Sequence, residues 1–244
     1  MQQSENQPAA IDVVLWKYPK NDSGEKRWMQ WLSPNERERA ATYRFERDRT
    51  SFIAGRCLLR QVLSAHTETQ PDKLLLQADA YGRLRAEGRD GLQFSLSNAD
   101  GLVAVAVTSE CERVGIDCER ADAEIEAAAL ASYCSLDERQ WLDQLPPGER
   151  SRAAVALWAL KESHLKALGV GLREDPRSVA FSWQDGIPDL VQSGAPDRQW
   201  HHRLIESGSQ HVAALAVHSQ FRAPSIHVLT FQDDSMPSEW PARS

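Results

Sequence analysis

The alternation of apolar and polar positions predicts a chain of short strands and a few long helices. Period-two alternation, or a run of β-branched and apolar residues, is typical of a strand, whereas apolar residues three and four apart are typical of a helix. Strands are therefore expected at residues 11–18, 73–77, 92–97, 102–107, 114–119, 181–183, 187–191 and 211–218. Helices are expected from residue 34 to about 65, over most of 121–141, and from the linker at 145–148 to residue 168.

Two helix boundaries are marked by residues that satisfy free backbone groups. Ser33, followed by Pro34 and then by Glu36, has the order of a capping box with proline at the first helical position. Gly169 follows Leu168, at a place where a helix that ends in a left-handed residue favours glycine. These signals predict one helix that begins at Pro34 and another that ends at Leu168.

The stretch Val114-Gly-Ile-Asp-Cys-Glu119 alternates cleanly. A strand here places its apolar residues on one face and both Asp117 and Glu119 on the other. The Cα atoms of the two acidic residues would then be roughly 6–7 Å apart. Like charges at that spacing repel each other unless they are exposed or bridged by a cation. A half-exposed acidic strand and a cation site are both compatible with this pattern.

The helical stretch near residue 160 adds a third carboxylate. Val155, Trp158, Leu165 and Leu168 recur at helical spacing and can share an apolar stripe. Glu162 and Lys166 are four residues apart, so they lie one turn apart on one face. Taken alone, this pair has the pattern of a solvated surface ion pair.

Combined with the acidic strand, however, the pair forms a set suited to phosphate chemistry. Asp117, Glu119 and Glu162 offer only oxygen ligands, which suit Mg²⁺, an ion that typically bridges to substrate phosphates. Lys166 could neutralise such a phosphate. Together these residues predict Mg²⁺-assisted chemistry on a polyphosphate.

A second basic feature lies earlier in the chain. The segment from residue 37 to 60 is rich in arginine, and most of these arginines fit a solvated helix face laced with ion pairs. Arg56 differs because it follows Gly55 inside an apolar stretch. A buried arginine needs an anionic partner, and phosphate matches the fork of its guanidinium group. Arg56 is therefore a candidate phosphate ligand, and Arg83 could hold further phosphate.

Composition and charge exclude several classes of function. The chain has 244 residues and a formal net charge of −7, which argues against general nucleic-acid binding. No apolar run reaches membrane-spanning length, and the polar start lacks the layout of a secretion signal. The four cysteines form no Cys-x-x-Cys pair, which favours a cytoplasmic protein with reduced thiols. His201 and His202 are adjacent and cannot share one face, so a loop or surface position is expected.

An internal similarity suggests two related halves. Residues 102–109 resemble residues 212–219, and a predicted helix precedes each at a similar separation. The expected fold is therefore α+β, with two halves of a helix packed on a small antiparallel sheet. A pseudo-twofold axis would relate the halves, and the site would lie in the cleft between them. The expected divisions are residues 1–112 and 113–232, followed by a poorly ordered tail at 233–244.

The acidic strand and the third helix also carry a family resemblance. Gly115-Ile-Asp-Cys-Glu119 followed by Trp158-Ala-Leu-Lys-Glu-Ser-His-Leu-Lys-Ala-Leu-Gly-Val-Gly-Leu172 resembles the paired signature of the 4′-phosphopantetheinyl transferases. The length and the two-half layout are similar to the Sfp-type, pseudodimeric branch. The resemblance implies transfer of 4′-phosphopantetheine from coenzyme A to a serine of an apo carrier protein (acyl, peptidyl or aryl), with release of adenosine 3′,5′-bisphosphate. It also implies dependence on Mg²⁺, with Mn²⁺ as an alternative, and a monomeric enzyme.

The resemblance assigns roles position by position. The implied metal ligands are Asp117, Glu119 and Glu162. Glu162, or a water beside it, would accept the proton of the carrier serine, and Lys166 would stabilise the pyrophosphate as its bond breaks. The implied coenzyme-binding residues are Arg56, Gly82, Arg83, Ser95, Ser97, Asn98, Lys161 and Lys166.

The sequence departs from the family pattern at two of these positions. Asn98 stands where the family commonly has histidine, and it can donate a neutral hydrogen bond but cannot carry charge. Arg83 replaces a lysine, which keeps the charge but changes the geometry. Two alternative functions stay open: a non-catalytic relative that binds coenzyme A or a carrier protein, and another Mg²⁺-dependent transferase that cleaves a pyrophosphate.

Overall fold

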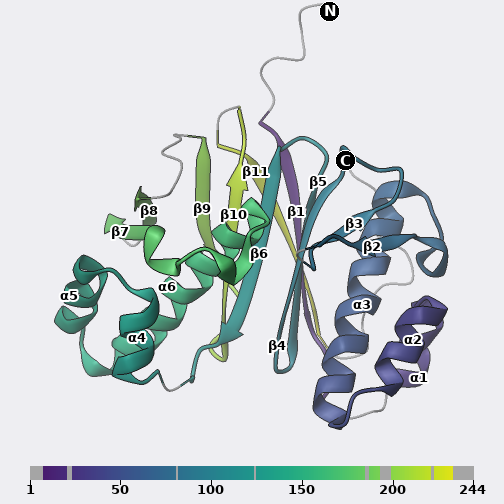
Figure 1. Cartoon of the computed structure of the whole chain (residues 1–244), viewed down its shortest axis with the longest axis horizontal. Helices are drawn as coiled ribbons and strands as arrows, with labels where there is room; N and C mark the ends of the chain where they lie inside the picture. Colours follow the sequence, from purple (N-terminus) through teal and green to yellow (C-terminus); the bar gives the residue numbers. More distant parts are fainter. Residues whose placement is uncertain are drawn as a thin grey trace, which may run out of the picture.

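The protein consists of two stacked β-sheets with a long helix on the outer face of each (Figure 1). The computed structural model describes residues 8–20, 24–80, 82–123, 125–184, 187–192, 199–220 and 223–232. Helices and strands form one mixed α+β structure, as the sequence predicts. Within the described residues, no helix is long and apolar enough to cross a membrane.

The elements follow one another in two runs. The first run contains β1 (Ala10–Lys17), α1 (Glu25–Trp28), α2 (Pro34–Ala41), α3 (Glu46–Thr67), β2 (Leu76–Ala78), β3 (Leu84–Ala86), β4 (Gln93–Ala99) and β5 (Leu102–Thr108). The second contains β6 (Arg113–Arg120), α4 (Ala127–Tyr133), α5 (Leu136–Gln144), α6 (Pro147–Leu168), β7 (Ala180–Gln184), β8 (Ile187–Gln192), β9 (Trp200–Ile205), β10 (His211–His218) and β11 (Ser225–Gln232). Short 3₁₀ turns lie at Met29–Trp31, Pro71–Lys73, Gly171–Arg173 and Pro176–Ser178.

The strand order is closely similar in the two large sheets. The first sheet has the order β11-β1-β5-β4 and the second has the order β6-β10-β9. In each sheet the last strand of the run pairs antiparallel with the first strand and with the strand just before it. A two-stranded hairpin, β2–β3 in the first run and β7–β8 in the second, follows the long helix.

The first sheet departs from the expected antiparallel layout at one edge. β11 runs parallel to β1, with Ala10 opposite Ser225 and Lys17 opposite Gln232. This strand was not predicted from the sequence, and the expectation of an antiparallel sheet in each half is wrong for the first. The chain reaches this edge by crossing from the second sheet after β10, so β11 closes the first sheet with a segment far away in sequence.

Side-chain size explains why β5 can be buried on both faces. Its residues Val103, Val105 and Val107 point toward α3, whereas Ala104 and Ala106 point toward the second sheet. Small residues on the inner face allow the sheets to approach closely, while the larger valines fill the space under the helix. The alternation that predicts a strand here therefore also sets the distance between the layers.

The two helical layers cover the outer faces. α3 packs on the first sheet through residues such as Ile53 and Leu58, which join Trp16 and Trp28 in one apolar cluster. α6 packs on the second sheet through residues such as Leu157, which join the outward side chains of β10. Figure 1 shows α1 and α2 beside α3 on one side of the molecule, and α4 and α5 beside α6 on the other.

Local signals account for several boundaries. Ser33 and Glu36 form the predicted capping box at the start of α2, and Gly169 ends α6 with φ at 79°, in the left-handed region. The helix expected over 121–141 is instead divided between α4 and α5. A second capping box, between Ser135 and Glu138, starts α5 and explains the division.

Some expectations need correction and others lie outside the described residues. His201 and His202 belong to β9 rather than to a loop, and His202 is packed against the ring of Phe181 at 4.9 Å between centroids. The four cysteines are free and buried, as expected for reduced thiols. The expected tail at 233–244 and the β7–β8 turn at 185–186 lie outside the described residues.

Candidate active site

The site is built where α6 lies against β6. Gly115 makes this contact possible: a Cβ atom placed there would lie 2.0 Å from the carbonyl oxygen of Ser163 and 2.5 Å from the backbone nitrogen of Ala167. Any side chain larger than hydrogen would therefore push the helix away from the strand. Because Asp117 and Glu119 lie on the same face of β6 as Gly115, this close approach brings Glu162 of α6 to them.

The three acidic residues predicted as one group interact with one another. Asp117 is 3% exposed and Glu162 is 9% exposed, while Glu119 is half-buried. Within the described part of the chain, Oδ2 of Asp117 and Oε1 of Glu162 are buried without a hydrogen-bond partner. Buried acceptors of this kind are costly unless something pairs with them, so the site has unused capacity for a cation or donor.

Burial and mutual repulsion raise the pKa values of two of these groups. Burial raises the pKa of Glu162, and the neighbouring charge of Asp117 raises it further. The pKa of Glu119 is raised by burial first and then by Asp117. Because Asp117 raises the pKa of both glutamates and Glu119 also raises that of Glu162, the three carboxylates lie close enough to act on one another.

Lys166 provides the positive charge inside the group. Its ammonium group donates to Oδ1 of Asp117 at 2.6 Å and to the hydroxyl of Ser97 at 2.9 Å. Burial lowers the pKa of Lys166, but the charge and hydrogen bond of Asp117 outweigh it, so the net pKa is raised. The surface ion pair with Glu162 that helical spacing allows is thus replaced by a pair with the strand.

Two serines of β4 join the sheets at this point. The hydroxyl oxygen of Ser97 accepts from the N–H of Cys118 at 3.2 Å, and that of Ser95 accepts from the N–H of Ile116 at 3.1 Å. Ser97 also donates to Oδ1 of Asp117 at 2.9 Å. These hydroxyls satisfy the free edge of β6, so both serines position Asp117, a role that sequence reasoning did not identify.

Trp158 orients Glu119. Its indole N–H donates to Oε1 of Glu119 at 3.1 Å, and this hydrogen bond opposes the rise in the pKa of Glu119. The ring also packs edge-on against Tyr133, with 5.1 Å between centroids. The sequence pattern places Trp158 only in an apolar stripe; the polar atom of its ring, next to an acidic strand, is the signal that could have indicated the second role.

We expect Trp158→Phe to separate these two roles. Phenylalanine keeps most of the packing on Tyr133 but lacks the donor, so the folded state should lose only about 1 kcal/mol. Without the hydrogen bond, the pKa of Glu119 should rise further. Titration of Glu119 by NMR and urea unfolding measure the two effects. Trp141→Phe, at a tryptophan stacked on Trp183 away from this group, is the matched control and should leave Glu119 unchanged.

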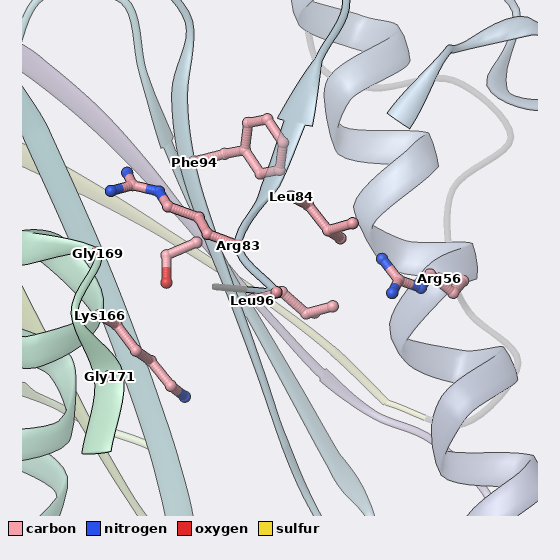
Figure 2. Close-up of a pocket in the computed structure, with 10 residues that line it drawn as sticks. Arg56, Arg83, Leu84, Phe94, Leu96, Lys166, Gly169 and Gly171 are labelled. Carbon is pink, nitrogen blue, oxygen red and sulfur yellow. The ribbon is translucent and has the colours of Figure 1, made fainter. Parts of the chain in front are cut away.

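A pocket of about 290 Å³ opens beside Lys166 (Figure 2). Three cationic side chains line it, together with apolar groups of β4 and the β2–β3 hairpin. The lining residues are Arg56, Gly82, Arg83, Leu84, Phe94, Ser95, Leu96, Lys166, Gly169 and Gly171. In Figure 2, Arg83 and Lys166 lie on the α6 side of the pocket, and Arg56 projects from α3 on the opposite side.

Arg56 is mostly buried, as the sequence predicts, and its guanidinium group is only partly paired. Its side chain is 14% exposed and lies 3.7 Å from Oε1 of Glu36, with its guanidinium over the ring of Phe52. Within the described residues, Nε and one terminal nitrogen of Arg56 are buried and lack hydrogen-bond partners. Burial lowers the pKa of Arg56, and Glu36 offsets part of that shift. An anion in the pocket would satisfy these donors.

Arg83 is held by the end of α6. Gly82, at φ 81°, forms the left-handed position of the turn before it. The guanidinium of Arg83 donates to the carbonyl of Ala167 at 3.3 Å and to the side chain of Gln93 at 3.4 Å. A cation at a helix C-terminus is favourable, so this arginine is placed at the pocket wall by α6 itself.

Asn98 lies near α3 rather than beside Lys166. Its side-chain amide donates to the carbonyl of Ser51 at 2.6 Å, and the side chain covers Gly55, where an added Cβ would lie 2.5 Å from the amide nitrogen. The donor that the resemblance assigns to a coenzyme phosphate is therefore used to join β4 to α3.

Lys161 does not belong to this site. Its side chain has no exposed surface, and its ammonium group lies 2.9 Å from Glu138 and donates to the carbonyls of Pro176 and Val179. A group buried in this way cannot contact a coenzyme, so the implied binding role is corrected to a structural one. Glu138 in turn accepts from the backbone N–H of Phe181, which ties α5, α6 and β7 together.

Lys161→Met should therefore affect folding and not the pocket. Removing one partner of a buried ion pair costs about 3–5 kcal/mol, because Glu138 would keep its charge. Lys73→Met, at an exposed pair with Asp72, should change the free energy of unfolding by no more than about 0.5 kcal/mol. Urea unfolding measures the free energy of unfolding, and titration with coenzyme A measures its affinity for the pocket. A large loss of coenzyme affinity in folded Lys161→Met protein would contradict this assignment.

The residues fit a divalent cation in chemistry, although not as a preformed cage. In the part of the chain that the structure describes, no three His, Cys, Asp or Glu side chains are arranged closely enough to hold a metal ion as they stand. The unpaired oxygens of Asp117 and Glu162 are nevertheless the hard, anionic ligands that Mg²⁺ takes in proteins. Lys166 currently supplies the compensating charge.

Two models of known families match the two parts of the chain. The model described as the 4′-phosphopantetheinyl transferase superfamily matches residues 113–216, and one described as 4′-phosphopantetheinyl transferase, N-terminal, matches residues 17–110. The two matches lie end to end and together cover most of the chain. The protein belongs to the 4′-phosphopantetheinyl transferase superfamily, in its Sfp-type branch, and is an enzyme of that class.

Individual relatives carry the same description. The chain is 26% identical over 231 residues to the phosphopantetheinyl transferase of Thraustochytrium sp., covering 86% of this chain and 79% of the relative. It is 29% identical over 168 residues to the 4′-phosphopantetheinyl transferase HetI of Nostoc sp., covering 66% and 70%. It is 25% identical over 154 residues to the 4′-phosphopantetheinyl transferase Sfp of Bacillus subtilis, covering 63% and 67%.

Proposed function

We propose that this protein transfers the 4′-phosphopantetheine group from coenzyme A to a serine of an apo carrier protein. The observation that supports this most directly is the meeting of two features at Lys166. That residue contacts the buried carboxylate of Asp117 and also lines the cationic pocket. A diphosphate in the pocket would thus lie beside an acidic group able to hold a divalent cation.

Different cationic side chains of the pocket would bind different phosphate groups of the coenzyme. We propose that Lys166 and Arg83 bind the diphosphate from the α6 side, and that Arg56 binds the 3′-phosphate from α3. Phosphate would satisfy the buried donors of Arg56, which have no hydrogen-bond partner among the described residues. Apolar side chains of the pocket, such as Leu96, would contact the rest of the coenzyme.

Asp117, Glu119 and Glu162 are the residues proposed to hold Mg²⁺, or Mn²⁺ in its place. When bound, the ion would neutralise charge that develops on the diphosphate during transfer. The chain's own contribution is to keep these ligands in place: Ser97 fixes Asp117, Trp158 fixes Glu119, and the contact at Gly115 fixes Glu162.

The proposed reaction is a displacement at phosphorus. The hydroxyl oxygen of the carrier serine forms a bond to the phosphorus that carries pantetheine, and the bond from that phosphorus to the bridging oxygen breaks. Adenosine 3′,5′-bisphosphate leaves with the bridging oxygen. Glu162, directly or through a water, accepts the serine proton.

The two runs of elements support a proposal about the symmetry of the fold. β1, α3, β2–β3, β4 and β5 have the same order and pairing as β6, α6, β7–β8, β9 and β10. We propose a pseudo-twofold axis between halves at residues 1–112 and 113–232. One chain would then supply both sides of the cleft, which is consistent with a monomeric enzyme.

Mass spectrometry tests the function. The protein is incubated with coenzyme A, Mg²⁺ and each of several apo carriers of the acyl, peptidyl and aryl classes. The expected result is the mass of one phosphopantetheine on at least one carrier, abolished by EDTA. A carrier whose acceptor serine is replaced by alanine is the control. No adduct on any carrier, from protein that binds coenzyme A, would overturn the proposal.

A further inference from the structure

Lys166 occupies the position of a bound cation. Its ammonium group is 2.6 Å from Asp117, and among the described residues no other cationic group is ion-paired with Asp117, Glu119 or Glu162. Asp117 is almost completely buried, whereas the Lys166 side chain is 28% exposed and lines the pocket. The lysine can therefore move toward the pocket, but the aspartate cannot follow it.

Leaving this pair intact would hinder both ligands. A divalent cation at Asp117 would face the positive charge of Lys166 at close range. A diphosphate in the pocket would have to share Lys166 with a carboxylate of the same sign as itself. If Lys166 moves without a metal ion, however, Asp117 keeps an uncompensated buried charge, which is costly.

We infer that Lys166 is a placeholder cation that exchanges partners when both ligands bind. The divalent cation replaces it at Asp117, and the coenzyme diphosphate receives it in the pocket. Figure 2 shows Lys166 extending from α6 toward this space. This exchange rests on the proposed function. It predicts that the metal ion and the coenzyme bind with positive cooperativity, because each ligand removes an unfavourable charge interaction that the other would meet alone.

The metal ion and the coenzyme must change each other's affinity by the same factor. If the coenzyme tightens binding of the ion by some factor, then the ion tightens binding of the coenzyme by the same factor. Couplings between sites commonly span about 5–150-fold, and exchange of a buried ion pair places this one at about tenfold or more. Replacing Lys166 by a neutral residue should remove the obstacle to the ion and abolish the coupling.

Binding of Mn²⁺ alone, measured by EPR of the free ion, tests the exchange. In the wild type, saturating coenzyme A should tighten Mn²⁺ binding by about tenfold or more. In Lys166→Met, Mn²⁺ without coenzyme should bind about tenfold more tightly than in the wild type, and coenzyme A should then change the affinity little. Lys20→Met, which removes a lysine from an exposed pair with Asp100, is the matched control and should behave as the wild type.

The variants distinguish exchange from simple bridging of the ion by the diphosphate. Bridging alone would give coupling in the wild type, but it would leave Mn²⁺ affinity without coenzyme unchanged in Lys166→Met; that result overturns the placeholder role. If Lys166→Met does not fold, the same Mn²⁺ measurements are made on Lys166→Gln, which is neutral but can still donate to Asp117. Binding is measured without a carrier, so failure here leaves the transfer assay valid, and absence of transfer leaves this test valid.

Discussion

Gly115→Ala is expected to abolish most transfer and to destabilise the fold, although the change adds a single methyl group. The new carbon would lie 2.0 Å from the Ser163 carbonyl oxygen and 2.5 Å from the Ala167 nitrogen. Both are backbone atoms of α6, so no side-chain rotation can relieve the contact. Overpacking of this kind costs about 1–3 kcal/mol, and urea unfolding measures it.

The loss of activity follows from what the contact positions. α6 would have to move away from β6, and this motion separates Glu162 and Lys166 from Asp117. Displacements of about 1 Å in an active site can lower rates about 100-fold. Initial rates of carrier modification at saturating coenzyme A measure this loss on the folded fraction.

Gly148→Ala is the matched control in α6. No atom lies within 4 Å of a Cβ added at Gly148, and alanine favours a helix. The variant should therefore be as stable as the wild type or up to about 1 kcal/mol more stable, with unchanged transfer. Equal behaviour of Gly115→Ala and Gly148→Ala would show that the packing at Gly115 does not maintain the site.

The sequence predicts the site well where one element determines the geometry. Alternation in β6 places Asp117 and Glu119 on one face, and the structure confirms this because each also affects the pKa of Glu162. The capping box at Ser33 and the left-handed Gly169 are local signals, and both are present. These features depend on residues close together in the chain, so their pattern is sufficient.

Prediction is weaker where partners come from different elements. Helical spacing allows Lys166 to pair with Glu162. In the folded protein, however, Lys166 forms its ion pair with Asp117, a buried carboxylate on a strand. The resemblance assigns Lys161 to the coenzyme beside Glu162, yet neighbours in a helix point about 100° apart and Lys161 faces Glu138. The sequence alone does not predict which face of α6 packs on the second sheet and which faces α5.

Two of the strands that the sequence did not predict, β9 and β11, were missed for a similar reason. β9 is rich in aromatic and histidine residues, and β11 is half exposed, so neither carries a strong apolar alternation. Each is defined by its neighbour: β9 pairs with β10, and β11 pairs with β1 from the far end of the chain. A strand at a sheet edge needs little burial of its own, because its partner provides the backbone hydrogen bonds.

Glu162→Gln should have opposite effects on activity and stability. Glutamine has nearly the same shape but cannot carry the negative charge or accept the serine proton, so transfer should fall about 10²–10⁴-fold. Stability should not fall, because glutamine removes a buried carboxylate beside Asp117. Rates of carrier modification and urea unfolding of the metal-free protein measure the two quantities.

The pH dependence of stability identifies the carboxylate responsible. Burial and Asp117 raise the pKa of Glu162 above its ordinary value of 4.5 in the folded protein. The folded state therefore holds a proton that the unfolded state has released, and wild-type stability falls as pH rises from about 4.5 through the raised pKa. Glu162→Gln lacks this loss, so its advantage over the wild type should grow across that window and then stay constant.

Glu149→Gln provides the control, because Glu149 is exposed in the first turn of the same helix. It should leave transfer unchanged and alter stability by no more than about 0.5 kcal/mol at any pH. If Glu162→Gln were instead destabilised at neutral pH while transfer persisted, Glu162 would be a structural residue. The acidic group of β6 and α6 would then have to work without it, and the assignment of Glu162 as metal ligand and base would fail.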